Sequence, residues 1–321
     1  MSNFTTIMPP YRGFLEPLGY IEPSPRVLFV KGKLPERRLK TVAIVGSRHN
    51  TRYGEEIAYR LAYELARHGV VVVSGLAYGI DSIGHQGCLD AGGTTVAVLG
   101  TPIDTIHPAA HIQLAREIVK TGAIISEYPT ATTPVAADDR AEFATDCVPL
   151  APGEFIAANG RRAVQYKASF LHRNRLISGL SDVVVVVEAA EKSGSLNTAT
   201  HALSQGKDVF AVPGNITSPY SQGCNKLIRQ GALPYTEPDD VLRLLFPKDY
   251  AISHRNSPKN LLGDTDVETA ILKSIAAGHR TGTDIMVAAK LPPEIFGEFI
   301  AILEIKGRVI SLGANTWSLC P

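Results

Sequence analysis

The chain has 321 residues, of which 45% are hydrophobic and 20% are charged, and its formal net charge of +1 does not by itself indicate a nucleic-acid-binding protein. Its apolar runs are too short to cross a bilayer, and its start, MSNFTTIMPPYRG, lacks the basic and apolar regions of a secretory signal. The four cysteines, Cys88, Cys147, Cys224 and Cys320, are scattered, which argues against a disulfide framework or a zinc site and favours the reducing cytoplasm.

Residues 1–40 are rich in proline and irregular, and we expect them to pack on the core as an N-terminal extension. From residue 41 to 245, strand-like runs alternate with helix-like segments. The runs are TVAIVG, VVVVSG, TTVAVLG, AIISEY, DVVVVVEA and DVFAVPG, with ALPYT as a weaker seventh. Unbroken valine-rich strands between amphipathic helices predict an α/β fold with a doubly wound, mostly parallel sheet.

Three further segments follow from the pattern. Residues 130–168 interrupt the alternation with weak periodicity, and so long a connection is usually functional or mobile. Residues 246–264 read as a linker. Residues 265–321 contain three helical patterns and then a hairpin around Gly-Ala-Asn, which is typical of a small winged-helix domain.

Ligands of open α/β sheets bind at the carboxyl ends of the strands, so the strand-to-helix turns are the candidate sites. In the first turn, Gly46 allows close backbone approach, Ser47 offers a hydroxyl, and Arg48 supplies a fork of donors for phosphate. The start of the next helix adds free amides and a positive dipole end. A capped helix with a solvated arginine is the competing interpretation.

The second turn, SGLAYGID, places Ser74, Gly75 and Asp81 around a helix start, where Asp81 caps the helix or anchors an arginine. A further turn, Ser193 to Ser195, forms another nest suited to phosphate. His85 on the following helix is interpreted as structural. No set of residues for nucleophilic, metal or Walker-type chemistry occurs in these turns, which favours binding over catalysis.

The segment FLHRNRLISGL precedes the five-valine strand. If it is helical, its apolar residues form one stripe, and Arg173 continues that stripe towards the cleft. Arg175 lies off the stripe, where it could reach round the rim. Phe170 precedes the helix in this interpretation and offers a face for stacking a base. A salt-bridged rim is the alternative.

Several of these motifs together resemble the DNA-processing protein A family, also called Smf. They are VAIVGSR, the VVSGLAYGIDSIGHQGCLDAGGTTVAVLG stretch, SEYP, RNRLISGLSDVVVVVEAAEKSGSLNTA and VFAVPGNITSPYSQGCNKLIRQGA, in order over residues 41–235. The resemblance implies an extended Rossmann-like domain that binds single-stranded DNA in a positively charged pocket. It also implies a homodimer formed through that domain and delivery of the strand to the RecA recombinase, chiefly in natural transformation. No cofactor, metal or membrane is implied.

Carried over motif by motif, the resemblance assigns DNA-binding roles to twelve residues. Phosphates would be held by the first turn, and the pocket floor would come from the second. Backbone and base would be gripped by the arginine-rich helix, and the far side would be closed by the third turn. The residues are Gly46, Ser47, Arg48, Ser74, Gly75, Phe170, Arg173, Asn174, Arg175, Ser193, Gly194 and Ser195.

The chain departs from the family pattern in three places. A long interruption stands where members have a short loop after SEYP, and we expect it to form an arm over bound DNA. Phe170 is followed by leucine, whereas members have proline at that position. No extra N-terminal helical domain is visible.

Two alternatives remain. Phosphoribohydrolases that resemble lysine decarboxylases share this sheet, but Thr200 and His201 stand where their catalytic glutamate would be needed. The winged helix could also read DNA sequence. Its third helix carries Glu294, Glu298 and Glu304 against Lys306 alone, so a protein contact is favoured.

Overall fold

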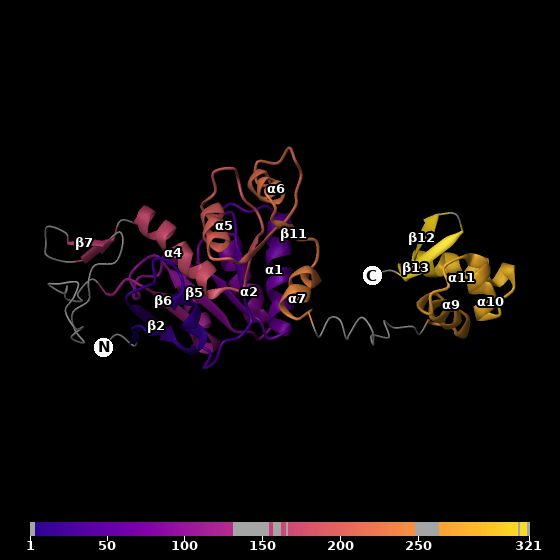
Figure 1. Ribbon diagram of the computed structural model, residues 1–321, viewed down its shortest axis with the longest axis horizontal. Helices are drawn as coiled ribbons and strands as arrows, with labels where there is room; N and C mark the ends of the chain where they lie inside the picture. The colour runs from indigo at the N-terminus through magenta and orange to yellow at the C-terminus, as the bar shows by residue number, and fades with distance from the viewer. Residues whose placement is uncertain are drawn as a thin grey trace. The chain divides into compact units, whose positions relative to one another are not determined.

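The computed structural model describes residues 4–130, 154–156, 162–164, 166–247, 263–313 and 315–319. It divides the chain into two compact units, residues 1–247 and 248–321 (Figure 1). Most of the interruption predicted over 130–168, including the expected arm, lies outside the described residues, as does most of the predicted linker. Of that interruption the structure gives two short paired strands, β7 (Glu154–Ile156) and β8 (Arg162–Val164).

The larger unit is built on a nine-stranded sheet with the spatial order β1-β2-β6-β5-β4-β3-β9-β10-β11. The seven neighbours from β6 to β11 run parallel, and β1 and β2 pair antiparallel at one edge. The strands are β1 (Thr5–Ile7), β2 (Leu28–Gly32), β3 (Thr41–Val45), β4 (Val71–Ser74), β5 (Thr95–Leu99), β6 (Ala123–Ser126), β9 (Val183–Val186), β10 (Asp208–Ala211) and β11 (Leu233–Pro234). The predicted doubly wound, mostly parallel sheet is therefore confirmed.

Helices cover both faces of this sheet because its central strands are apolar on both sides. Every residue of β3, β4 and β9 is buried. One face is covered by α4 (Tyr166–Leu180), α5 (Gly194–Ser204) and α6 (Gln222–Arg229), and the other by α1 (Arg52–Arg67), α2 (Ile80–Asp90), α3 (Ile112–Thr121) and α7 (Pro238–Leu245) (Figure 1). The short 3₁₀ helix η2 (Ala109–His111) leads into α3.

The N-terminal extension is more regular than its proline-rich sequence suggests. It supplies strands β1 and β2 and the 3₁₀ helix η1 (Gly13–Gly19), whose Phe14, Leu15 and Leu18 are buried in the main core. With three residues, β1 is too short for periodicity to reveal it.

The smaller unit has the predicted three helices and hairpin. They are α9 (Asp266–Ala276), α10 (Gly282–Ala289), α11 (Pro293–Ile305), β12 (Val309–Gly313) and β13 (Thr316–Leu319). Ile271, Phe296 and Leu303 lie in its apolar core. Lys306, at the end of α11, forms ion pairs with Asp264 at 2.8 Å and Glu268 at 2.6 Å, so the cation nearest this helix is already neutralised.

Candidate nucleic-acid interface

The topology places a pocket where the strand order reverses. β3 lies between β4 and β9, and the chain leaves β3 and β9 towards opposite edges of the sheet, so their carboxyl ends separate. A pocket of about 400 Å³ opens there. It is lined by Val45, Gly46, Ser47, Arg48, Ala77, Asp81, Phe170, Leu171, Arg173, Asn174, Ile177, Ala190, Ser193, Gly194, Ser195 and Thr198.

The structure brings two arginines from distant parts of the chain to one aromatic ring in this pocket. The guanidinium carbon of Arg48 lies 5.6 Å from the centroid of the Phe170 ring, and that of Arg173 lies 5.9 Å from it. Phe170 belongs to α4 and does not precede it, which corrects the expected helix start. The two cations therefore line the same pocket, with Arg48 exposed and Arg173 buried beneath it.

Arg173 is held rigidly. It is 4% exposed, and its Nη1 donates to the carbonyl oxygens of Gly75, at 2.9 Å, and of Val98. Burial lowers the pKa of Arg173 to about 10, and Asp81 opposes that shift. The side chain therefore remains a cation at neutral pH, fixed in place before any ligand arrives.

Asp81 occupies the amides of the turn that follows β4. Its Oδ2 accepts hydrogen bonds from the backbone N–H of Gly75, at 3.1 Å, and of Ala77, at 3.4 Å. Leu76, between them, adopts a left-handed backbone with φ of 59°. Burial raises the pKa of Asp81, while Arg173 lowers it. This nest therefore holds a carboxylate of the chain itself, and an external anion cannot use it.

The glycines of the first two turns serve internal packing. A Cβ at Gly46 would lie 2.7 Å from Ile80, and one at Gly75 would lie 2.6 Å from the guanidinium of Arg173. Gly79, with φ of +75°, would meet the carbonyl oxygen of Ser47 at 2.3 Å. Close approach of a ligand backbone, which the sequence analysis expected of Gly46, is thus not the reason for glycine here.

The start of α1 is also occupied from within. Glu188, buried at the end of β9, accepts hydrogen bonds from the Thr51 backbone N–H at 2.8 Å and hydroxyl at 2.6 Å. A Cβ at Gly54 would lie 2.3 Å from its carboxylate. The expected free amides and dipole end of α1 are therefore neutralised by Glu188. Sequence reasoning missed this residue, although a glutamate directly after five valines was a signal.

The start of α5, in contrast, faces the pocket. Ser193 caps the helix by accepting from the Ser195 backbone N–H, and the two hydroxyls are 2.8 Å apart. Gly194 has open space where a Cβ would stand. Asn174, from α4, donates to the Gly194 carbonyl at 3.3 Å and to Asn197 at 3.1 Å. The positive end of α5 is thus the helix terminus available to an anion here.

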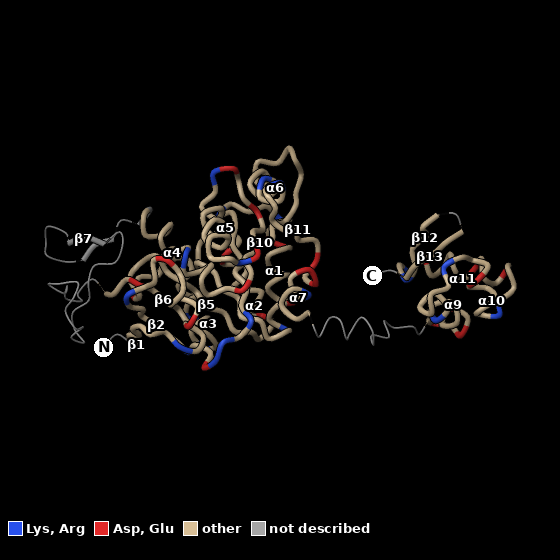
Figure 2. Tube along the Cα trace, in the orientation of Figure 1, with Lys and Arg blue, Asp and Glu red and all other residues tan. Residues whose placement is uncertain are grey.

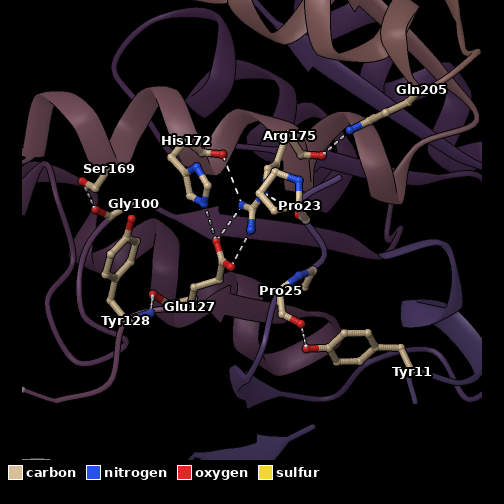
Figure 3. A network of polar contacts seen from close by, with 11 residues as sticks. Tyr11, Pro23, Pro25, Gly100, Glu127, Tyr128, Ser169, His172, Arg175 and Gln205 are labelled. Carbon is tan, nitrogen blue, oxygen red and sulfur yellow. Dashed lines mark hydrogen bonds and ion pairs between the residues drawn. The ribbon is translucent and has the colours of Figure 1, made fainter. Parts of the chain in front are cut away.

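Three predicted site residues, Ser74, Gly75 and Arg175, do not line the pocket, although Gly75 borders a small hollow beside it. Ser74 is fully buried, and its hydroxyl donates to the Ile44 carbonyl at 2.6 Å, so it joins strands and does not form the pocket floor. Arg175 is 2% exposed and donates to both carboxylate oxygens of Glu127, at 2.6 and 2.7 Å (Figure 3). Its Nε donates to the Pro23 carbonyl at 2.9 Å. The expectation that Arg175 reaches round the rim is wrong, because its charge is paired in the core.

Two aromatic residues that the sequence analysis did not select lie beside the pocket. Tyr78 and His107 line a small hollow with Arg48 and Phe170. The His107 ring stacks on Phe170 with centroids 5.5 Å apart, while Tyr78 is 49% exposed. Ser47, partly exposed nearby, accepts from the His49 backbone N–H at 3.1 Å. Tyr78 therefore offers more free ring surface than Phe170 does.

No helix within the described ranges has the length and hydropathy to cross a membrane. The same residues contain no group of three or more histidine, cysteine or acidic side chains placed to hold a metal ion.

The family model for DNA recombination-mediator protein A matches residues 7–140 and 152–246. Protein Smf of Escherichia coli is 40% identical over 222 residues, which are 69% of this chain and 51% of that protein. DNA processing protein DprA of Bacillus subtilis is 38% identical over 222 residues, with 69% of this chain and 64% of that protein covered. The chain thus spans between half and two thirds of the length of these relatives.

Two solved structures share the fold. DNA processing protein A from Streptococcus pneumoniae superposes with a TM-score of 0.60 and 32% identity over 75% of this chain and 74% of that one. DNA processing protein A from Helicobacter pylori, whose structure describes a unique single-stranded DNA binding mode, gives a TM-score of 0.57 and 28% identity over 76% and 96%.

Proposed function

Since the chain belongs to the DNA recombination-mediator protein A family, we propose that it binds single-stranded DNA without sequence preference in the pocket between the ends of β3 and β9. The observation that carries this proposal is the convergence of Arg48 and Arg173 on the Phe170 ring. One exposed and one buried cation beside an aromatic ring, near the start of a helix, can hold a phosphate backbone while leaving bases unread.

We assign a separate role in DNA binding to each of three groups of side chains. Arg48, exposed at the mouth, contacts phosphate directly, and the start of α5 receives a second phosphate at Ser193 to Ser195. Arg173 supplies a buried positive field and keeps Phe170 in place. Phe170 already has His107 stacked on it, whereas Tyr78 meets His111 only edge to face and is 49% exposed. Tyr78 is therefore the ring we assign to base stacking.

We also propose a wider role, which rests on the resemblance of the chain to this family. We infer that the bound strand is delivered to the RecA recombinase, in natural transformation and recombination, and that two copies associate through the larger unit. The protein acts as a binder in the cytoplasm and catalyses no reaction. The one carboxyl group in the described pocket lining, Asp81, is fixed by two backbone amides, which leaves it poorly placed for the acid–base step of a phosphoribohydrolase.

Titration of a labelled oligothymidine tests the proposal, with duplex DNA of equal length as competitor. With roughly three to five phosphate contacts, the log–log slope of affinity against salt should lie between about −2 and −3.5. Arg48→Glu should weaken binding by more than about tenfold and leave the unfolding transition unchanged. Arg60→Glu on α1 is the matched control, since it makes the same charge change at an exposed position outside the pocket.

Equal affinity of the Arg48→Glu and Arg60→Glu variants would overturn the assignment of the pocket. Release of free adenine from AMP by the wild-type protein would instead favour the phosphoribohydrolase interpretation.

A further inference from the structure

A second concentration of positive charge lies outside the pocket. Residues 31–40, KGKLPERRLK, contain five basic residues and one acidic residue, whereas the net charge of the whole chain is only +1. This segment, called the basic connector below, joins β2 to β3, and blue segments mark it at the lower edge of the larger unit in Figure 2. A local excess of positive charge attracts anionic ligands to this part of the surface.

The basic connector borders a hollow at the amino ends of the strands, whereas the pocket lies at their carboxyl ends. The hollow has a volume of about 670 Å³ and lies at the amino ends of β3, β5 and β6. Lys33, Arg37 and Lys120 provide its cations, Glu36 its one carboxylate, and Thr94 and Thr121 its hydroxyls. This set of donors suits a polyanion.

Only part of this charge is used within the protein. Arg38 forms an ion pair with Asp182 at 2.9 Å, and Lys120 forms one with Glu117 at 2.6 Å. Lys33, Arg37 and Lys40 are exposed and make no side-chain hydrogen bond or ion pair with the part of the chain that the structure describes. Three cations are therefore available to a partner.

The backbone beneath these cations is fixed. The Lys33 backbone N–H donates to the Gly122 carbonyl at 2.8 Å, and Leu34 and Leu39 pack against the main core. A Cβ at Gly13 would lie 2.6 Å from the Glu36 carbonyl oxygen, so η1 supports the connector closely. The exposed side chains thus project from a rigid base, which lowers the entropic cost of holding a ligand.

We propose that the basic connector and its hollow form a second contact for the phosphate backbone of the DNA strand that leaves the pocket. This inference rests on the proposed function. A nucleic acid is favoured over an acidic protein because the leucines of the hollow are committed to the core, which leaves charge and hydroxyls as the recognition groups. Bases are not stacked here, since the lining contains no aromatic side chain, and the contact is to the phosphate backbone.

The separation of the two sites determines which DNA reaches both. β3 connects them, and the six residue steps from Lys40 to Gly46 span roughly 20 Å at strand spacing. A DNA strand that fills the pocket must extend over that distance and pass around the sheet to reach the hollow. An oligomer of about five nucleotides, whose roughly four phosphates suffice for three or four contacts, should therefore occupy only the pocket. One of about 30 nucleotides should reach both sites.

The test compares labelled oligothymidines of these two lengths by anisotropy with the full chain. Lys33→Glu combined with Arg37→Glu removes two cations of the hollow, and Arg60→Glu combined with Arg243→Glu makes the same charge change outside both sites. Circular dichroism verifies that each variant is folded. We expect the hollow variant to bind the long oligomer about tenfold more weakly than the control variant, with a salt slope shallower by about 1.4.

On the short oligomer the two variants should be equal. The proposal is overturned if they bind the long oligomer equally, or if the hollow variant already loses the short one relative to the control. Arg48→Glu separates the two levels of inference, because unchanged binding of the short oligomer by that variant would reject the pocket itself.

Discussion

The buried pair of Arg175 and Glu127 allows a direct test of which arginine of α4 serves the fold and which serves the ligand. Arg175→Met removes the guanidinium but keeps most of the aliphatic volume. The pair is 2% and 5% exposed, and both carboxylate oxygens accept hydrogen bonds (Figure 3). The variant therefore leaves Glu127 buried without its cation.

The cost follows from that burial. Removing one partner of a buried ion pair typically destabilises a protein by about 3–5 kcal/mol, because an uncompensated charge remains. The Pro23 carbonyl also loses its donor, which costs about 1 kcal/mol. Burial lowers the pKa of His172, and its Nε2 lies 3.9 Å from Glu127, beyond hydrogen-bond distance. The ring is therefore a poor substitute for the guanidinium, even though the variant also removes the lowering effect of Arg175. Against a usual total of 5–15 kcal/mol, the loss is large.

Urea unfolding measures this loss. The single tryptophan, Trp317, lies in the smaller unit, so its fluorescence follows that unit while far-ultraviolet circular dichroism follows both. We expect the transition of the larger unit to move to lower urea and the tryptophan transition to stay in place. Adding Glu127→Leu to Arg175→Met should recover most of the stability, to within about 2 kcal/mol of wild type, because a buried pair can be replaced by apolar groups.

The double variant should also bind oligothymidine within about twofold of wild type. An Arg175→Met protein that loses less than about 1 kcal/mol yet fails to bind DNA would refute this reasoning and return Arg175 to the DNA-binding surface.

Three further predictions follow from the site. Tyr78→Ala should weaken oligothymidine binding by about 1–3 kcal/mol, because one stacked base loses its partner. The salt slope should stay the same, because no phosphate contact is lost. An altered slope with unchanged affinity would argue against this role of Tyr78. Gly75→Ala places a Cβ 2.6 Å from the Arg173 guanidinium and should cost about 1–3 kcal/mol of stability and most of the DNA affinity. Gly194→Ala has open space around the new Cβ and should leave stability near wild type. Equal unfolding midpoints of these two variants would contradict this prediction. Burial lowers the pKa of His85 to about 3, so its neutral form stabilises the fold above pH 6.5. That contribution is lost as the pH falls from 6.5 towards 3, by at most about 1.4 kcal/mol per pH unit. His85→Gln should flatten the slope of unfolding free energy against pH, and an unchanged slope would contradict the assignment.

The sheet was predictable because its signal is local. Five consecutive valines cannot be placed except in a strand buried on both faces, and β9 and its neighbours follow that rule. The position of the pocket followed as well, since a parallel sheet gathers the ends of its strands at one edge. The sequence alone did not predict which hydrogen-bond or ion-pair partner each polar group at these strand ends would have.

The two arginines of α4 show where that limit lies. At 3.6 residues per turn, Arg173 and Arg175 point about 200° apart, so a pocket on one side can take only one of them. Arg173 continues the apolar stripe and is buried at the pocket, as the stripe indicated. The partner of Arg175 is Glu127, 48 residues earlier in the chain, and no local pattern joins residues so far apart.

The carboxylates that fill two of the turns define what kind of anion the pocket can hold. Glu188 occupies the start of α1, and Asp81 occupies the amides after β4. A nucleotide-binding sheet would leave those donors free to surround a di- or triphosphate. Here the described lining leaves Arg48 at the pocket mouth, the start of α5, and the buried charge of Arg173 beneath them. Such an arrangement cannot concentrate enough donors on one polyphosphate, but it matches single phosphates spaced along a strand, whose weak contacts add up and are screened together by salt.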